Sequence, residues 1–111
     1  MKQLYRYVEE LNVDIERITQ DNLVELAELI EHCIRDELAK ILNQRLTNLV
    51  ATIGIEIADK VINISVDLEV EAYVLPRMNL ENILDRVINY AFTKARIYLS
   101  RFRKHKENDN K

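Results

Sequence analysis

The chain has 111 residues, of which 48% are hydrophobic and 32% are charged, and its formal net charge is −3. These values are typical of one folded domain and exclude a disordered chain, so we expect a domain over residues 1–103 and a polar basic tail over 104–111. A single cysteine excludes an internal disulfide, and no apolar run is long enough to span a membrane.

Residues 1–17 are compatible with two structures. Apolar residues recur at steps of three and four, as in an amphipathic helix: Leu4, Val8, Leu11, Ile15 and Ile18. Leu11, Val13 and Ile15 also alternate with polar residues, as in a short strand. We favour an N-terminal helix and keep a short third strand as the alternative. No secretory signal is visible at this end, so we expect a cytoplasmic protein.

The next segment predicts a long amphipathic helix over about residues 20–46. Thr19 is a suitable N-cap, and Asp21 would face the positive end of the helix dipole. One apolar face continues from Leu23 to Leu42. Cys33 belongs to that face and is expected to be buried, whereas the neighbouring His32 is expected on the surface, so we assign neither a metal nor a catalytic role.

Residues 49–72 show the clearest pattern in the chain. Apolar and polar residues alternate strictly on both sides of Ala58-Asp59-Lys60, which predicts an antiparallel hairpin with strands at about 48–57 and 61–72. After Pro76, Asn79 is a suitable N-cap for a second long helix over about residues 79–103. The chain is therefore predicted to be α+β, with a hairpin packed against two long helices.

A two-stranded sheet is marginal in water and leaves two free edges, so the sequence also predicts a homo-oligomer, most simply a dimer that extends the sheet. A third strand from the N-terminal segment would be the alternative way to complete the sheet.

Two segments resemble a family of small archaeal proteins of unknown function. The run Ile18–Leu29, ITQDNLVELAEL, is similar to that family's opening helix, and the strand Ile62–Val70 with a following helix that contains Ala91 and Ala95 is similar to its second half. The resemblance covers about residues 18–100. It implies an α+β fold and an archaeal source, but no chemistry.

Charge is unevenly distributed along the chain. Residues 1–93 hold 9 Lys and Arg against 17 Asp and Glu, whereas residues 94–111 hold 7 against 2. The basic residues of the last helix lie at helical spacing with one tyrosine: Arg86, Tyr90, Lys94, Arg101 and Lys104. Such a face can bind phosphates and stack on a base, although cations also favour a helix C-terminus for purely structural reasons.

A second set of charged residues, in the predicted hairpin, is acidic. Asp67, Glu69 and Glu71 point to one side of the second hairpin strand and form a candidate contact row for a cation or a basic partner, although we favour the simpler interpretation of a solvated sheet face. The lone glycine, Gly54, excludes a P-loop and a dinucleotide fingerprint. We therefore expect a non-enzymatic interaction or assembly module with no cofactor and an unidentified protein partner. The alternative is a weak, sequence-nonspecific nucleic-acid binder.

Overall fold

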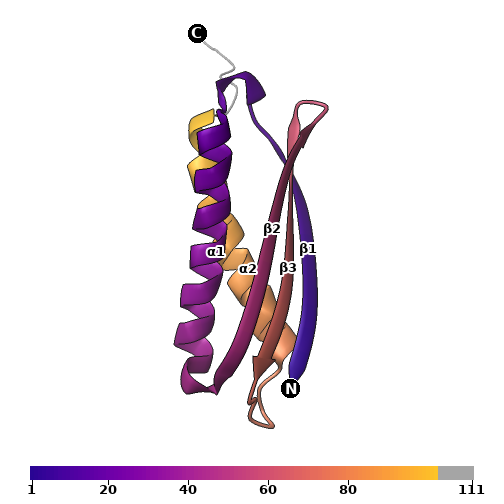
Figure 1. Cartoon of the computed structure of the whole chain (residues 1–111), viewed down its shortest axis with the longest axis vertical. Coiled ribbons are helices and arrows are strands. Elements are labelled where there is room, and N and C mark those ends of the chain that lie inside the picture. Colours follow the sequence, from indigo (N-terminus) through magenta and orange to yellow (C-terminus); the bar gives the residue numbers. More distant parts are fainter. Residues whose placement is uncertain (103–111) are drawn as a thin grey trace.

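The computed structural model describes residues 1–102 and has the predicted α+β fold. Three antiparallel strands form one sheet, and two helices cover one of its faces (Figure 1). In chain order the main elements are β1 (Lys2–Asn12), α1 (Gln20–Leu42), β2 (Leu46–Ala58), β3 (Val61–Ala72) and α2 (Leu80–Leu99). Short 3₁₀ turns cover Ile15–Arg17, Asn43–Arg45 and Ser100–Phe102.

The N-terminal helix that we favoured is wrong, because residues 2–12 form a full strand. Leu4 and Val8, which suggested a helical stripe, both point away from the helices and are 68% and 53% exposed. The inward side chains are instead Gln3, Tyr5, Tyr7, Glu9 and Leu11, and only the last of these is aliphatic, so a search for aliphatic periodicity does not detect the strand. Tyrosine favours strands, and β1 pairs with β3 along its whole length on one side.

β3 is the central strand, with β1 on one side and β2 on the other. The hairpin between β2 and β3 closes through Asp59 and Lys60, both at positive φ (53° and 68°), as in the tight turns that match the twist of paired strands. Because the third strand comes from the same chain, our argument for a dimer from a marginal two-stranded sheet no longer applies. Both β1 and β2 are nevertheless edge strands of the sheet.

Both predicted N-caps are confirmed. The Thr19 hydroxyl accepts a hydrogen bond from the backbone N–H of Asn22, and the Asn79 side chain accepts one from Asn82. α1 ends at Leu42, four residues before the predicted end, because Asn43 takes a positive φ of 52° that stops the helix without glycine. α2 ends at Leu99, and residues 100–102 of its predicted continuation form the last 3₁₀ turn, while residue 103 lies outside the described residues.

The core lies between the helix layer and the inner face of the sheet. Every second residue of β3, from Ile62 to Ala72, is buried against the helices. Phe92 of α2 is fully buried and packs on Tyr7 of β1, with ring centroids 4.8 Å apart. The long strands and helices run along one direction, so the molecule measures 55 × 25 × 19 Å. One face of the sheet is left without a covering layer (Figure 1).

Candidate interaction surfaces

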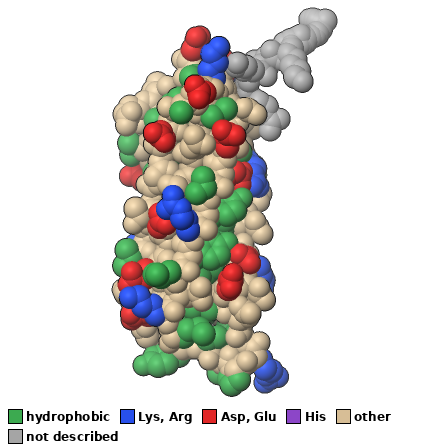
Figure 2. Space-filling view, turned by 90° about the vertical axis from the view of Figure 1, so that its right-hand side faces the viewer, with side chains coloured by type: hydrophobic (Ala, Val, Ile, Leu, Met, Phe, Trp, Pro, Cys, Tyr) green, Lys and Arg blue, Asp and Glu red, His purple; other side chains and the backbone are tan. Residues whose placement is uncertain are grey.

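The uncovered face of the sheet, which we call the open face, is built from alternate residues of all three strands. Apolar side chains from the two edge strands lie among charged ones, as the space-filling view shows (Figure 2). Leu4 and Val8 of β1 and Val50 of β2 are 68%, 53% and 48% exposed. Exposed apolar groups of this kind, rimmed by charges, mark surfaces that contact other macromolecules more often than surfaces that only face water.

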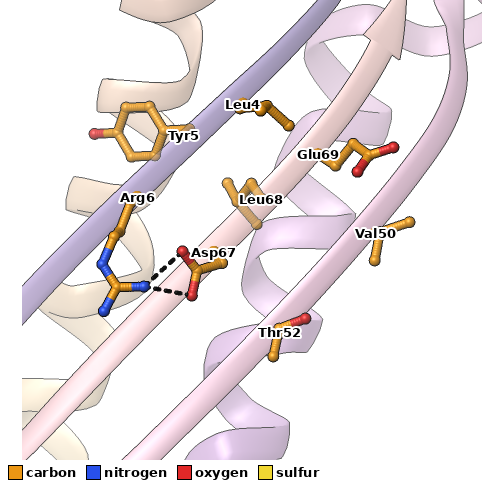
Figure 3. Close-up of a pocket in the computed structure, with 8 residues that line it drawn as sticks. All are labelled: Leu4, Tyr5, Arg6, Val50, Thr52, Asp67, Leu68 and Glu69. Carbon is orange, nitrogen blue, oxygen red and sulfur yellow. Dashed lines mark hydrogen bonds and ion pairs between the residues drawn. The ribbon is translucent and has the colours of Figure 1, made fainter.

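Two residues of the predicted acidic row lie on the open face next to cations from β1. Asp67 accepts hydrogen bonds from one guanidinium nitrogen of Arg6 at 2.8 Å to each carboxylate oxygen, and Lys2 lies 3.1 Å from Glu69. Arg6, Asp67 and Glu69 border a shallow depression of about 330 Å³ whose sides are formed by Leu4 and Val50 (Figure 3). Cross-strand pairing therefore neutralises much of the charge that the sequence placed in this row.

Glu71, the third residue of the row, lies at the end of β3, where its backbone carbonyl accepts a hydrogen bond from Thr47. Within residues 1–102, no group of three His, Cys, Asp or Glu side chains is arranged to hold a metal ion. The carboxylates of Asp67 and Glu69 are thus better described as partners of β1 than as converging ligands.

The described residues of the predicted basic face lie on the outer side of α2 and of the 3₁₀ turn that follows it. Arg86, Tyr90, Lys94 and Arg101 are all exposed, and Ile97 between them is 62% exposed. The Lys94 ammonium lies 5.5 Å from the centre of the Tyr90 ring, and the Arg101 guanidinium lies 4.7 Å from that of Tyr98. Lys104 and the basic tail 104–111 lie outside the described residues.

The neighbouring helix α1 presents the opposite charge. Its exposed acidic residues are Asp21, Glu25, Glu28 and Asp36. α1 and α2 pack against each other, and the Tyr98 hydroxyl donates a 2.5 Å hydrogen bond to Glu25 between them. Burial, reinforced by that hydrogen bond, raises the pKa of Tyr98. The outer surface of the helix layer therefore has exposed acids along α1 and exposed cations toward the end of α2, whereas the first turns of α2 expose Glu81 and Asp85.

Arg96 is a further basic residue of α2, but it does not belong to that basic face. Its guanidinium donates two hydrogen bonds to the Glu9 carboxylate, at 2.8 and 2.6 Å, and the Tyr7 hydroxyl donates a third at 2.6 Å. Burial would raise the pKa of Glu9, but the hydrogen bonds from Arg96 and Tyr7 outweigh burial and lower it. Sequence analysis missed this cluster because its members are 87 positions apart.

Tyr5 makes a second link between β1 and α2. Its hydroxyl donates a 2.6 Å hydrogen bond to Asp85, and burial together with that hydrogen bond raises the pKa of the phenol. Tyr5 and the Glu9 cluster therefore attach β1 to the helix layer through polar contacts at its rim.

His32 and Cys33 lie where the sequence placed them. Cys33 is 8% exposed within the apolar face of α1, and burial raises the pKa of its thiol. His32 is on the surface, 3.0 Å from Asp36 one turn later. A thiol held in its protonated form is a poor nucleophile, so this pair is best described as part of the structure of α1.

None of the helices in the described part of the chain has the length and apolarity needed to cross a membrane. No protein-family model and no curated protein matches the sequence. A crystal structure of a protein from Thermococcus onnurineus NA1 has a similar fold, with a TM-score of 0.69 and 14% identity, over 89% of this chain and 94% of that one. At this identity the likeness shows the fold alone, and the resemblance to a small archaeal family stays a prediction.

Proposed function

We propose that this protein is a non-enzymatic interaction and assembly module of the cytoplasm. The observation that carries the proposal is the charge division of the helix layer, with exposed acids on α1 and exposed cations beside Tyr90 and Ile97 toward the end of α2. Charge division of this kind steers the approach of a partner with the complementary pattern, and exposed aromatic and aliphatic groups supply the area that is buried on contact. The partner best suited to α2 is an acidic protein surface with apolar groups.

The proposal is tested by capture from a lysate of the native source, followed by mass spectrometry. The test variant, Lys94→Glu with Arg101→Glu, reverses two cations of the α2 face. The matched control, Lys40→Glu with Arg77→Glu, changes the net charge equally at exposed positions outside that face. We expect one protein to be captured by the wild type and the control but lost with the test variant. Equal capture by all three would contradict docking through α2.

A metal-dependent enzyme is the competing class for the acidic row. Calorimetry with Mg²⁺, Mn²⁺ and Ca²⁺ measures it directly, with Asp67→Ala as the variant that removes one carboxylate. We expect no tight binding, because Arg6 and Lys2 already accompany Asp67 and Glu69. Tight binding that Asp67→Ala abolishes would replace the interaction module by a metal-binding function.

Nucleic-acid binding is a second candidate, and the Lys94–Tyr90 pair favours it. A cation beside an exposed aromatic ring can neutralise a phosphate while the ring stacks on a base. Binding of this type would be weak, without sequence preference and steeply dependent on salt. Fluorescence anisotropy in about 50 mM salt, with single-stranded and duplex probes, should then detect binding that Lys94→Glu with Arg101→Glu removes. No change at tens of micromolar protein would exclude this candidate.

Assembly with a second copy is the remaining part of the proposal, and we take the simplest form to be a homodimer. The sheet supports it because β1 and β2 each have one edge without a paired strand within residues 1–102. Edge strands expose backbone donors and acceptors that a second chain can pair with.

A further inference from the structure

The two edges of the sheet differ in their chemistry. β1 carries four charged residues among 11, and one of them, Glu9, points inward to Arg96. Charged residues and inward-pointing charges are devices that prevent an edge strand from pairing with another chain. β2 has neither a charged residue nor a proline from Leu46 to Ile55. Its free edge therefore lacks the protection that the edge of β1 has.

β2 is also the longest strand, with 13 residues, and it extends about 43 Å at about 3.3 Å per residue. Its pairing with β3 is shifted only between Leu46 and Asn48, and the register is regular from Leu49 to Ala58. About every second residue of an edge strand directs its N–H and C=O away from the sheet, so the regular part of β2 presents a continuous series of free backbone groups.

The surface of α1 beside this edge is suited to a second copy. α1 packs over β2, and Arg35 lines a shallow hollow with the first residues of that strand. Arg35 pairs with Glu31 at 3.0 Å, and Val24, seven residues before Glu31 on the same side of α1, is 49% exposed. The charged pair therefore lies toward the start of β2, and the exposed Val24 lies two turns nearer the start of α1.

We propose that a second copy of this chain pairs with the free edge of β2 in antiparallel fashion, across a two-fold axis near Thr52. Thr52 is the middle residue of β2, so pairing there uses the whole strand and produces a continuous six-stranded sheet. The α1 helices of the two copies then lie side by side and antiparallel. This inference rests on the assembly part of the proposed function and names its surface.

The side of the molecule that carries the free edge of β2 is large enough for a specific interface between two copies. A strand of about 43 Å and a molecule 25 Å deep give a side face of about 1,000 Å², and burying about half of it on each copy reaches about 1,000 Å² in total, the lower limit for a specific interface. Contact between two open faces is the rival arrangement. It would use the exposed apolar residues of β1 and β2 instead of the backbone of β2, and the label distances below distinguish the two arrangements.

The first test adds lysines to the edge, as natural edge strands do. Val50→Lys with Thr52→Lys changes exposed positions of β2, and Leu4→Lys with Val8→Lys is the matched control on the same face of β1. Sedimentation equilibrium should give twice 13.1 kDa for the wild type and the control. The β2 variant should dissociate with a Kd raised on the order of tenfold or more, because like charges then face each other across the axis. Equal masses for both variants would overturn the proposal, provided that circular dichroism shows both folded.

The second test measures distances between the two copies, so it does not depend on a variant that weakens the dimer. Spin labels at Thr52→Cys, in a Cys33→Ala background, should lie within about 20 Å of each other, because opposed residues of paired strands are about 5 Å apart at Cβ. Labels at Val8→Cys should be farther apart, since about five strand spacings, or about 24 Å, separate the two β1 strands.

The two tests together separate the inference from the function on which it rests. A dimeric mass with the Val8 labels closer than the Thr52 labels would keep the homodimer and refute pairing through β2. A monomeric wild type at about 100 µM would refute the homodimer and the edge together. Docking of a different protein through α2 is decided separately, by the capture experiment with the Lys94 and Arg101 variant.

Discussion

The Glu9–Arg96 pair should stabilise the fold more than any exposed ion pair of the open face. Replacing Arg96 by Met keeps much of the aliphatic length but removes both donors to Glu9, leaving a carboxylate whose side chain is 13% exposed with only the Tyr7 hydroxyl as a partner. Losing one partner of a buried pair costs about 3–5 kcal/mol, and a surface pair contributes about 0–1 kcal/mol.

Arg96 itself is 45% exposed, so the cost should lie between these limits, at about 2 kcal/mol. For a domain of this size that corresponds to a fall in Tm of roughly 8 °C. Urea unfolding followed by circular dichroism measures the loss directly. Arg6→Met is the matched control, because Arg6 also contacts a carboxylate across strands, but with both side chains about half exposed (64% and 47%). It should cost less than about 1 kcal/mol.

The same pair predicts a pH dependence. The pKa of Glu9 is lowered in the folded protein, so its stabilising contribution is complete above the ordinary value of 4.5 and is lost as the pH falls through the lowered value. The stability difference between the wild type and Glu9→Gln should therefore be constant near neutral pH and shrink below about pH 4. If Arg96→Met costs no more than Arg6→Met, or if the difference for Glu9→Gln is unchanged down to pH 3, the cluster does not act as described.

Three further substitutions test the packing of the core, the close contact between β2 and β3 at Gly54, and the N-cap of α1. Phe92→Ala should lower the free energy of unfolding by about 3–5 kcal/mol in urea titrations, because the ring is fully buried against Tyr7, and a loss under 1 kcal/mol would contradict that packing. Gly54→Ala places a Cβ 2.7 Å from the Ser65 hydroxyl of the paired strand, so it should lower Tm, and the loss should largely disappear in a Ser65→Ala background. Thr19→Ala should cost about 1 kcal/mol through loss of the α1 cap, whereas Thr19→Ser should be nearly neutral.

The elements with strong periodicity were predictable from the sequence. The hairpin was recognised because apolar residues alternate on both sides of Asp59 and Lys60, and the two helices were recognised because their apolar faces follow the caps Thr19 and Asn79. The first strand was not predictable in this way, because its inner face consists mainly of tyrosines and a glutamate. Two of its aliphatic residues face outward. A hydropathy pattern detects apolar side chains that are buried away from water, so it does not detect a buried glutamate. Glu9 is tolerated inside only because Arg96 donates hydrogen bonds to it.

Some features of the candidate surfaces were likewise predictable from the sequence, and others were not. Helical spacing placed Arg86, Tyr90, Lys94 and Arg101 on one face, since the period of an α-helix alone decides that. The sequence could not show that the cations of β1 pair with Asp67 and Glu69, or that Arg96 pairs with Glu9. These pairs depend on how strands and helices that are distant in the chain pack together. Local periodicity thus determined the elements and their polar faces. Only the tertiary structure decided which charges neutralise each other and which edge of the sheet is left unprotected.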